Sequence, residues 1–574
     1  GELFDEFVAT LSQQWQERDK ELLSLDNKRL ANPYWYQEAS QVGMMLYLDN
    51  FFDSLTNIDH HLAYLEELGI TYLHIMPLFK MPPLLNDGGY AVSDFNRIDP
   101  RFGTDDEFDN FVTACRRRGI SLCLDFVLNH TSDEHEWAER AKRGETKYQD
   151  YYFTFKERTM VDAYEESVGE VFPVTAPGNF TYNGEMERWV LTTFNNYQWD
   201  LNYQNPHLFL EMVKSLLKWA NRGIEVFRFD AIPYIWKEWG TTSRNLPQVH
   251  TLMRLFRLVL EIVAPATIIK GEVVMPPANV TPYFGSIKAP ESHLLYNFTF
   301  MVELWNSLAI GDSRPLKALI GKIPHNLPRG ASWVNYVRCH DDIGWGFDEE
   351  VAREMGFDPF SHRQFLIKFF EGSFEGSFSR GELYEADPAT LDARNSGTCA
   401  SLCGLEGPDY ECAIKRVLLL HAICFIFSGL TVIYSGDEIG QLNDYSYHEE
   451  PTKAHDSRFL HRGKFDWNIA NQRDNLTLPS SQIFQGLKSL IEVVKNEAAL
   501  SYPNSILPLE GGEDSLLLLS IEGQGEKLLF IANLSGESKK FDYHGLLHPL
   551  INPVAVKEGE IVVAPYAYHL FKTT

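Results

Sequence analysis

The feature that most constrains the fold is a regular alternation, from about residue 43 onward, of short apolar runs with longer amphipathic segments. Short apolar runs are typical of buried strands. Strands that alternate with helices indicate an α/β fold of parallel βαβ units, and eight such units close naturally into a (β/α)8 TIM barrel. The eight expected strands are Met44–Leu48, Tyr72–Leu78, Ser121–Leu128, Glu225–Phe229, Thr267–Lys270, Leu294–Phe298, Trp333–Arg338 and Leu430–Tyr434.

Several segments outside these runs repeat apolar residues at helical spacing. Between the runs, this spacing predicts helices over Asp59–Leu68, Asp105–Arg118 and Leu208–Trp219. Before the first run, apolar residues recur at the same spacing among charged residues, which predicts helix over 3–30. The chain therefore begins with a short helical N-terminal region.

Two intervals between expected strands are too long for simple crossovers. Residues 131–204 follow the third strand and 342–409 follow the seventh, so we expect two inserted loop domains. Loops after barrel strands lie on the face that carries the active site, so both insertions are expected to shape a pocket. The C-terminal tail, 500–574, contains runs that are typical of strands, so we expect a C-terminal β-sandwich domain. The expected division is 1–40, barrel parts 41–130, 205–341 and 410–499, insertions 131–204 and 342–409, and a β domain over 500–574.

The charge of the chain argues against two classes of partner. The 574 residues include 51 Lys and Arg against 79 Asp and Glu, a formal net charge of −28. Such a charge repels phosphate backbones and anionic lipid, so neither nucleic acid nor membrane is an expected partner. The most apolar stretch, Ala422–Tyr434, is shorter than the roughly 18 residues of a membrane-spanning helix.

The cysteines favour a reducing compartment. The chain has seven, an odd number without regular spacing, which predicts free thiols. Cys399, Cys403 and Cys412 lie near one another, but no His lies among them, so idle or buried thiols are favoured over a zinc site. The N-terminus shows no signal segment, and the expected location is cytoplasmic.

Polar residues gather at the ends of four expected strands. Asp125 and His130 lie at the end of the third strand, and Arg228 and Asp230 at the end of the fourth. The fifth is followed by Glu272, and the seventh by His340, Asp341 and Asp342. A single Asp at a strand end is more often a helix cap, but four such segments in order, at barrel-like intervals, indicate one active rim.

These segments resemble the four signature regions of the α-amylase superfamily. They read DFVLNH (125–130), FRFDA (227–231), GEVV (271–274) and RCHDD (338–342). Within that superfamily the chain is most similar to amylosucrases and the related sucrose hydrolases, over about residues 40 to 574. This closer resemblance rests on DGGYAVSDF (87–95), TTFNNYQWDLNY (192–203), WVNYVRCHDDIGW (333–345), HRQF (362–365), GSFSRG (376–381) and HDSRFLHR (455–462).

The resemblance implies a retaining mechanism that uses two carboxyl groups. Asp230 matches the nucleophile and would form a β-glucosyl ester, and Glu272 matches the general acid/base. Arg228 would keep Asp230 ionised. Asp341 matches the third carboxylate, which stabilises the transition state. His130 and His340 match residues that bind sugar hydroxyls, with a structural role as the alternative.

The resemblance also implies a closed pocket for one glucosyl unit. Asp87 and Arg458 match a salt bridge that closes the pocket of amylosucrases, although unrelated surface charges are the alternative. Tyr90 and Phe194 would pack against the sugar ring, and for Phe194 a core role stays open. We expect Asp342, Arg363 and Arg394 to contact substrate, and Val274 and Met275 to line the leaving-group side.

The implied function is sucrose cleavage with fructose release and transfer of glucose to an α-1,4-glucan or oligosaccharide acceptor. The alternatives are a sucrose hydrolase or α-glucosidase that transfers glucose to water and, more remotely, a non-catalytic barrel. Many α-amylase relatives hold calcium through the residue that matches Asn129, but amylosucrases keep it without needing the ion. No Asp-rich loop of calcium spacing occurs, so we assign no metal and no cofactor.

Overall fold

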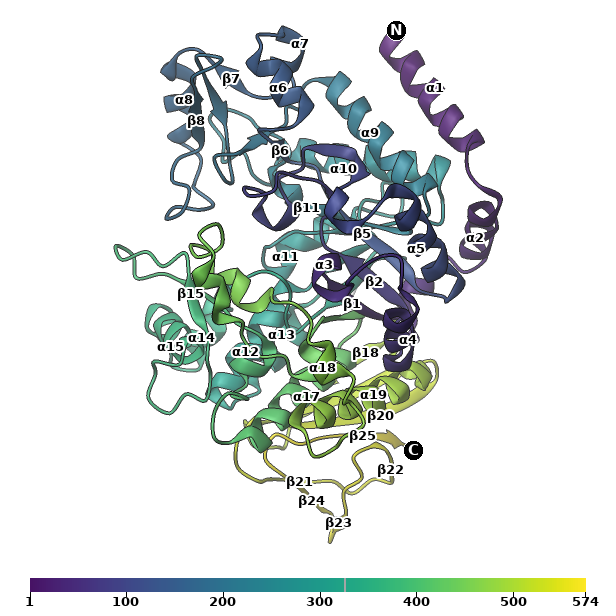
Figure 1. Ribbon diagram of the computed structural model, residues 1–574. Helices are drawn as coiled ribbons and strands as arrows, with labels where there is room; N and C mark the ends of the chain where they lie inside the picture. Colours follow the sequence, from purple (N-terminus) through teal and green to yellow (C-terminus); the bar gives the residue numbers. More distant parts are fainter. Residues whose placement is uncertain (325–326) are drawn as a thin grey trace.

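A closed barrel of eight parallel strands forms the centre of the computed structural model, which describes residues 1–324 and 327–574 (Figure 1). Consecutive barrel strands are hydrogen-bonded neighbours, and the last strand pairs with the first. The chain therefore has the predicted (β/α)8 architecture. The strands are β1 (Val42–Leu46), β2 (Tyr72–Ile75), β5 (Ser121–Val127), β11 (Val226–Asp230), β12 (Ile268–Gly271), β13 (Leu294–Tyr296), β14 (Ser332–Asn335) and β17 (Leu430–Tyr434).

The seventh barrel strand is shorter than predicted. We expected it to reach Arg338, but β14 ends at Asn335. The Asn335 side chain donates to the carbonyls of Phe427 and Ser428, and the ladder with β17 stops there. Arg338 instead donates to the carbonyl of Gly397 at 3.0 Å. The RCHDD segment therefore lies in a loop beyond the strand, where its side chains are free of the β ladder.

Helices cover the outside of the barrel, as expected when both faces of a parallel sheet are buried. Local signals fix their ends: Thr104 and Glu107 form a capping box at the start of α5, and Gly69, with φ of 93°, ends α4. The predicted span of α4 is confirmed. The main helices are α4 (Asp59–Leu68), α5 (Asp105–Arg117), α9 (Pro206–Asn221), α10 (Pro247–Val263), α12 (Phe298–Ile310), α13 (Arg314–Lys322), α17 (Tyr410–Ile426) and α19 (Pro479–Asn496).

The segment predicted as helix over 3–30 is helical, and it forms two helices with a turn between them. They are α1 (Glu2–Gln16) and α2 (Lys20–Ala31). Asp19 caps α2 by accepting from the amide of Glu21 at 2.7 Å. Arg18, in the turn, forms a buried ion pair with Asp26 at 2.6 Å and donates to the carbonyl of Ala220. The turn is thereby fixed against the barrel, and periodicity alone did not reveal it.

Both insertions contain secondary structure of their own. The segment after β5 includes a three-stranded sheet and the pair β6–β10, and the segment after β14 includes three helices, one of them α16 (Cys399–Leu402), and a hairpin. Figure 1 shows α6, α8 and β7 above the barrel and α14, α15 and β15 to its lower left. The elements are β6 (His130–Ser132), α6 (Glu136–Lys142), β7 (Thr154–Phe155), α8 (Arg158–Glu165), β8 (Phe180–Asn183), β9 (Arg188–Leu191), β10 (Gln198–Asp200), α14 (Glu349–Glu354), α15 (Pro359–Glu371), β15 (Glu382–Tyr384) and β16 (Arg394–Ser396).

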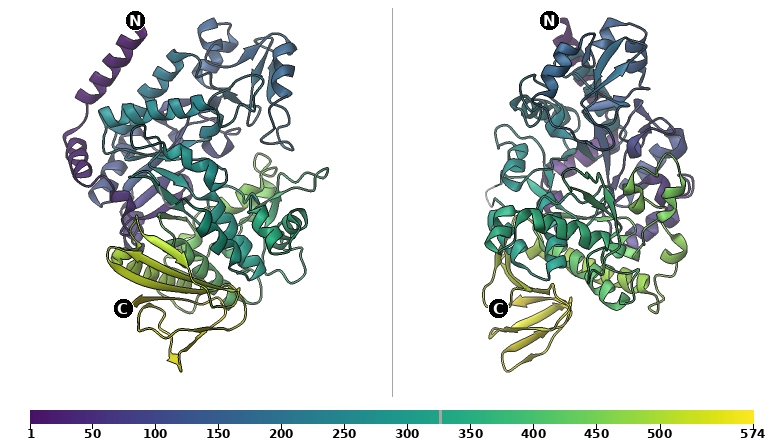
Figure 2. Two further views of the ribbon diagram at one scale, coloured as in Figure 1. Left: turned by 180° about the vertical axis from the view of Figure 1, so that it is seen from behind. Right: turned by 90° about the vertical axis from the view of Figure 1, so that its left-hand side faces the viewer.

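The C-terminal segment consists of two antiparallel sheets packed around one apolar cluster (Figure 2). The five-stranded sheet contributes Leu518 and Ile531 to the cluster, and the three-stranded sheet contributes Phe541 and Ile561. Among the described residues, no helix is long and apolar enough to cross a membrane. The larger sheet consists of β18 (Ser505–Pro508), β19 (Leu516–Gly523), β20 (Glu526–Asn533), β25 (Tyr568–Thr573) and β22 (Leu547–Ile551), and the smaller of β21 (Lys539–Asp542), β24 (Glu560–Val563) and β23 (Val556–Lys557).

Candidate active site

A cavity of about 800 Å³ lies where the carboxyl ends of the barrel strands meet the two insertions. All thirteen residues proposed from the sequence as site residues line this cavity. The thirteen are Asp87, Tyr90, His130, Phe194, Arg228, Asp230, Glu272, His340, Asp341, Asp342, Arg363, Arg394 and Arg458.

Arg228 connects the polar ends of two barrel strands. Its Nη1 lies 2.8 Å from Asp125 Oδ1 and also contacts Asp230 Oδ1. Asp125 is fully buried and bonded to His74 Nε2 at 2.7 Å. Burial opposes the charge of Asp125, but Arg228 and His74 outweigh it and lower its pKa to about 2. Asp125 is therefore an anchor for Arg228, which presents a positive charge to Asp230.

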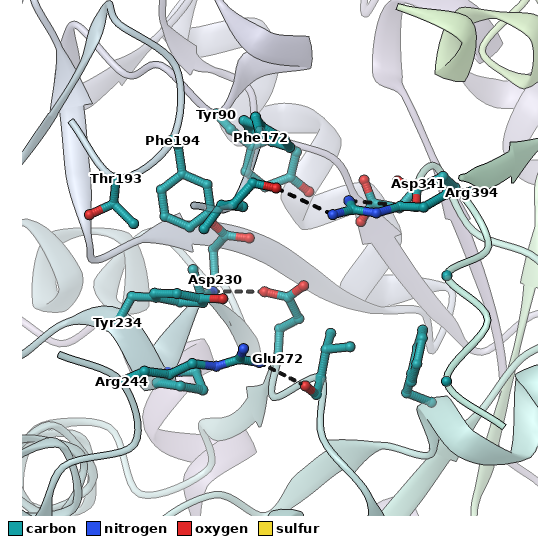
Figure 3. Close-up of a pocket in the computed structure, with 18 of the residues that line it drawn as sticks. Tyr90, Phe172, Thr193, Phe194, Asp230, Tyr234, Arg244, Glu272, Asp341 and Arg394 are labelled. Carbon is teal, nitrogen blue, oxygen red and sulfur yellow. Dashed lines mark hydrogen bonds and ion pairs between the residues drawn. The ribbon is translucent and has the colours of Figure 1, made fainter. Parts of the chain in front are cut away.

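Glu272 follows β12 directly and approaches the end of β11. Its Oε2 accepts from the amide of Ala231 at 2.7 Å, and its Oε1 lies 3.7 Å from Arg228 Nη2 (Figure 3). Ala231 has φ of 50°, a left-handed conformation that is unusual for a residue with a Cβ. The turn after Asp230 thus aims one amide at the Glu272 carboxyl and holds it beside Asp230.

The two carboxyl groups have coupled charges. Burial first, and then the neighbouring Glu272 carboxylate, raise the pKa of Asp230, while the Arg228 guanidinium lowers it. One proton shared by the pair removes the repulsion between them. Arg228 contacts Asp230 but lies 3.7 Å from Glu272, so its positive charge acts more strongly on Asp230 than on Glu272.

Asp341 lies beside two guanidinium groups and the imidazole of His340. Its Oδ1 is 3.7 Å from Arg458 Nη1 and 3.6 Å from Arg462 Nη2, and its Oδ2 is 3.4 Å from His340 Nε2. Burial alone would raise the pKa of Asp341, but His340 and the two guanidinium groups lower it well below its usual range. Asp341 is therefore an ionised acceptor facing the cavity.

His130 and His340 are buried and neutral near pH 7. Burial lowers the pKa of His340 to about 3 and also lowers that of His130. His340 Nε2 shares a hydrogen bond with the Tyr90 hydroxyl at 2.8 Å, and the two rings stack at a centroid distance of 5.4 Å. His130 Nε2 bonds to the carbonyl of Tyr90 at 2.9 Å. Tyr90 therefore holds both imidazoles in place.

The predicted pair of Asp87 and Arg458 lies together at one end of the cavity. Arg458 Nη2 donates to Asp87 Oδ1 at 2.8 Å and to Asp456 Oδ2 at 2.7 Å. The side chains of Asp87 and Arg458 are only 10% and 9% exposed. A buried guanidinium with two carboxylate partners therefore forms a fixed, charged part of the cavity wall.

An aromatic wall faces these polar groups. The Phe194 ring lies 5.0 Å from that of His130, 5.4 Å from that of Tyr234 and 6.1 Å from that of Phe172. Figure 3 shows Tyr90, Phe172 and Phe194 along one side of the cavity and Arg394 reaching in from the other. Aromatic faces pack well on the C–H faces of a sugar ring, so this wall suits a glycosyl ligand.

The second insertion brings three polar side chains to the opening of the cavity. Arg394 Nη2 donates to the carbonyl of Val171 at 3.3 Å, which joins the two insertions, and its Nη1 is 3.9 Å from Asp342 Oδ2. Arg363 is paired with Glu349 at 3.0 Å. Arg363 and Arg394 therefore line the cavity from the second insertion.

Asn129 binds the positively charged side chain of Lys237. Lys237 Nζ donates to Asn129 Oδ1 at 2.6 Å, lies 2.8 Å from Asp200 Oδ2 and also contacts the carbonyl of Tyr234. These oxygens are of the kind that bind a hard metal ion. Lys237 and Asp200 are buried, and Asp200 also accepts from the amide and hydroxyl of Thr193. The ammonium thus joins the first insertion to the barrel.

Sequence reasoning missed several residues of the site. Tyr234 and Arg244 come from the segment after β11, and Arg462 comes from the segment after β17. The HDSRFLHR segment contains Arg462, so that motif was a usable signal; nothing in the local sequence singled out Arg244. Val274 lines the cavity as expected, whereas Met275 packs partly against the core instead, because the chain turns after Val274.

Comparison with known families agrees with this geometry. Residues 44–343 match the model of the α-amylase catalytic domain, and this stretch is more than half of the chain. The chain belongs to the α-amylase family. The matched residues contain Asp230, Glu272 and Asp341, which the barrel brings into one cavity.

Curated relatives within this family carry different activities in their names. The chain is 28% identical to a trehalose synthase of Thermus thermophilus, over 94% of this chain and 56% of that protein, so it spans little more than half of that relative. It is 27% identical to a glucosylglycerate phosphorylase of Escherichia coli K12, over 98% and 96% of the two chains. A glucosylglycerate phosphorylase of Allomeiothermus silvanus is 30% identical over 79% and 77%.

Solved structures share the fold. The trehalulose synthase MutB from Pseudomonas mesoacidophila MX-45 superposes with a TM-score of 0.68 at 18% identity, covering 94% of this chain and 99% of that one. Sucrose 6F-phosphate phosphorylase from Thermoanaerobacter thermosaccharolyticum gives a TM-score of 0.68 at 18% identity, covering 88% and 95%. At these identities the likeness concerns the fold alone.

Proposed function

We propose that the chain is a retaining α-glucosyl-transferring enzyme of the amylosucrase type, with sucrose as donor and an α-1,4-glucan or oligosaccharide as acceptor. The observation that carries this proposal is the wall formed by Asp87 and Arg458 beside Asp341. A cavity closed there holds one glucosyl unit behind the bond to be cleaved, which favours attack on a terminal residue. The family alone does not specify the donor, because its members carry several activities in their names.

The reaction begins with cleavage of the donor. The Asp230 carboxylate attacks the anomeric carbon, while Glu272 gives its proton to the departing glycosidic oxygen. A glucosyl ester forms on Asp230, and fructose leaves with the proton. Arg228 supports the ionised state of Asp230 before attack, and its contact with Asp230 Oδ1 orients the carboxylate.

The second half returns both groups to their starting state. Glu272 takes a proton from the acceptor hydroxyl, whose oxygen attacks the anomeric carbon as the bond to Asp230 breaks. Asp341 and His340 hydrogen-bond the ring hydroxyls, and these bonds strengthen as positive charge develops on the ring. The neutral state of His130 and His340 lets each donate one hydrogen bond and accept another.

Transfer to water is the alternative that the opening of the cavity favours. Gly169, in the loop of the first insertion, lines the opening without a side chain, so this position has no group to hold an acceptor sugar. A sucrose hydrolase or α-glucosidase would use the same three carboxylates. The unpaired thiols favour a reducing compartment, so we also propose a cytoplasmic location.

One experiment tests the donor and the acceptor together. The purified enzyme is incubated with sucrose, with and without glycogen, and fructose, glucose and chain length are measured. The proposal predicts fructose release in excess of free glucose, with glycogen extended by α-1,4 linkages. Equal fructose and glucose in both reactions would favour the hydrolase, and no fructose from sucrose would reject the donor. The Asp230→Asn variant is the matched inactive control.

A further inference from the structure

Arg244 enters the cavity from a constrained loop between β11 and α10. Its neighbours Ser243 and Asn245 both have left-handed backbones, with φ of 48° and 59°. Such conformations cost about 1 to 3 kcal/mol for residues with a Cβ and persist only when their surroundings fix them. The amide of Asn245 donates to the carbonyl of Pro233 at 2.8 Å, and Tyr283 Oη donates to Asn245 Oδ1 at 2.6 Å. The loop thus holds Arg244 in a defined place.

The Arg244 guanidinium lines the same cavity as Glu272 and bonds to the segment that directly follows it. Its Nη2 donates to the carbonyl of Val274, two residues beyond Glu272, at 3.1 Å. Its Cζ lies 5.2 Å from the centroid of the Tyr234 ring. Figure 3 shows Arg244 and Glu272 in the same part of the cavity. One carbonyl bond leaves other N–H groups of Arg244 free to bind a ligand.

The charge of Arg244 has no protein partner. Over residues 1–324 and 327–574, no carboxylate forms an ion pair with Arg244, whereas Arg363 is paired with Glu349. Across the opening, Arg394 is only loosely paired with Asp342, at 3.9 Å. The opening therefore presents guanidinium groups from two sides, and the one beside Glu272 lacks a counter-charge.

We propose that Arg244 binds an oxyanion, a carboxylate or phosphate, on the molecule that accepts the glucosyl unit. A guanidinium is a planar donor that matches these groups, and a charge-assisted hydrogen bond is stronger than one to a neutral hydroxyl. Acceptors with an anionic group next to their hydroxyl are then used better than neutral ones of the same shape. This inference rests on the proposed glucosyl ester on Asp230.

The step balances without any further reactant. The acceptor hydroxyl oxygen forms a bond to the anomeric carbon, and its proton passes to Glu272. The bond between that carbon and the Asp230 carboxylate breaks, and its electron pair returns to the carboxylate. The oxyanion bound by Arg244 is unchanged. When inorganic phosphate is the acceptor, one of its own oxygens attacks and the product is a glucose phosphate.

The test compares matched acceptors with sucrose as donor at constant ionic strength. The pairs are glycerate with glycerol and glucose 6-phosphate with glucose, and inorganic phosphate is added alone. We expect the anionic member of at least one pair, or phosphate, to be used at least about 10-fold better in kcat/KM. The acceptor that shows the preference identifies the bound group: glycerate indicates a carboxylate, glucose 6-phosphate a phosphate ester, and inorganic phosphate the free ion. In Arg244→Gln the preference falls to about 1, while the exposed control Arg97→Gln keeps it.

Two results overturn the proposal: equal use of anionic and neutral acceptors, or a preference that Arg244→Gln leaves unchanged. If sucrose is not cleaved at all, the proposed function fails, and the anion site is then tested by calorimetric titration of the free enzyme with glycerate and with phosphate. Binding that weakens about 10-fold in Arg244→Gln supports the site. Absence of binding, or equal binding to both proteins, rejects it.

Discussion

Arg458 and Asp87 form an ion pair, with Nη2 2.8 Å from Oδ1, and both side chains line two cavities at once. One is the candidate active site, and the other is a neighbouring cavity of about 340 Å³. The pair is thus the partition between them. Its two members are not equivalent, because Arg458 also donates to both carboxylate oxygens of Asp456.

This asymmetry predicts that Arg458→Ala is more damaging than Asp87→Ala. Loss of the guanidinium leaves two buried carboxylates unpaired, whereas loss of Asp87 leaves Arg458 still bonded to Asp456. We expect kcat/KM to fall at least about 10²-fold in Arg458→Ala, because displacement of the ring by about 1 Å can cost that much. The double variant should lose less than the sum of the two, and strict additivity would mean that the residues act independently.

The proposed roles of Asp230 and Glu272 predict different responses to the leaving group. Glu272→Gln should lower turnover of sucrose by about 10²- to 10⁴-fold, because the leaving oxygen loses its acid. α-Glucosyl fluoride needs no proton, so its cleavage should be far less affected. Asp230→Asn should abolish both reactions. Initial rates on the two donors, with thermal unfolding as the control for folding, decide the matter; equal losses on both donors for Glu272→Gln would contradict its role as acid.

The cluster around Lys237 predicts that activity survives excess EDTA, because the ammonium already binds the oxygens of Asn129 and Asp200. Lys237→Met should destabilise the protein by about 3 to 5 kcal/mol, since it leaves the buried Asp200 carboxylate without its cation. Urea unfolding measures the effect. The control Lys218→Met, which removes one exposed bond to a carbonyl, should cost about 1 kcal/mol or less. Inactivation by EDTA that calcium reverses would contradict this account.

The raised pKa of the buried Glu438 predicts that the free energy of unfolding falls as the pH rises. Burial raises its pKa to about 7, against the bonds it accepts from Gly436 and Tyr64. A raised folded pKa stabilises the protein fully below the unfolded value of 4.5, and this contribution is lost as the pH passes 7. The difference corresponds to about 3 kcal/mol.

The matching measurement is urea unfolding of the wild type and Glu438→Gln at pH 5 and pH 8. The wild type should lose about 2 to 3 kcal/mol more than the variant between these values. The amide of Gln can keep both contacts, because it accepts from Gly436 and donates to Tyr64. An equal pH dependence of the two proteins would show that Glu438 stays in one protonation state.

The sequence was sufficient for the barrel and for most of the residues around the cavity. Local apolar runs marked the eight strands. Closure of these strands into a barrel places Asp230, Glu272 and Asp341 on the same rim, and this could be predicted without any measured distance. The ends of the strands were predicted less accurately from the sequence. The run through Val337 is as apolar as the strand before it, but the β14 ladder stops at Asn335 because the side chain of Asn335 bonds to the chain before β17.

The sequence by itself determined what depends on neighbours in the chain: the alternation of strands and helices, and the order in which their polar ends appear. Asp87 and Arg458 are 371 residues apart, and only a family resemblance connected them before the fold did. The tertiary structure alone decided that Lys237 binds Asn129 and that Arg244 points beside Glu272. Each depends on where a long loop returns to the barrel, and that path is set by packing and hydrogen bonds between distant segments, which no local pattern records.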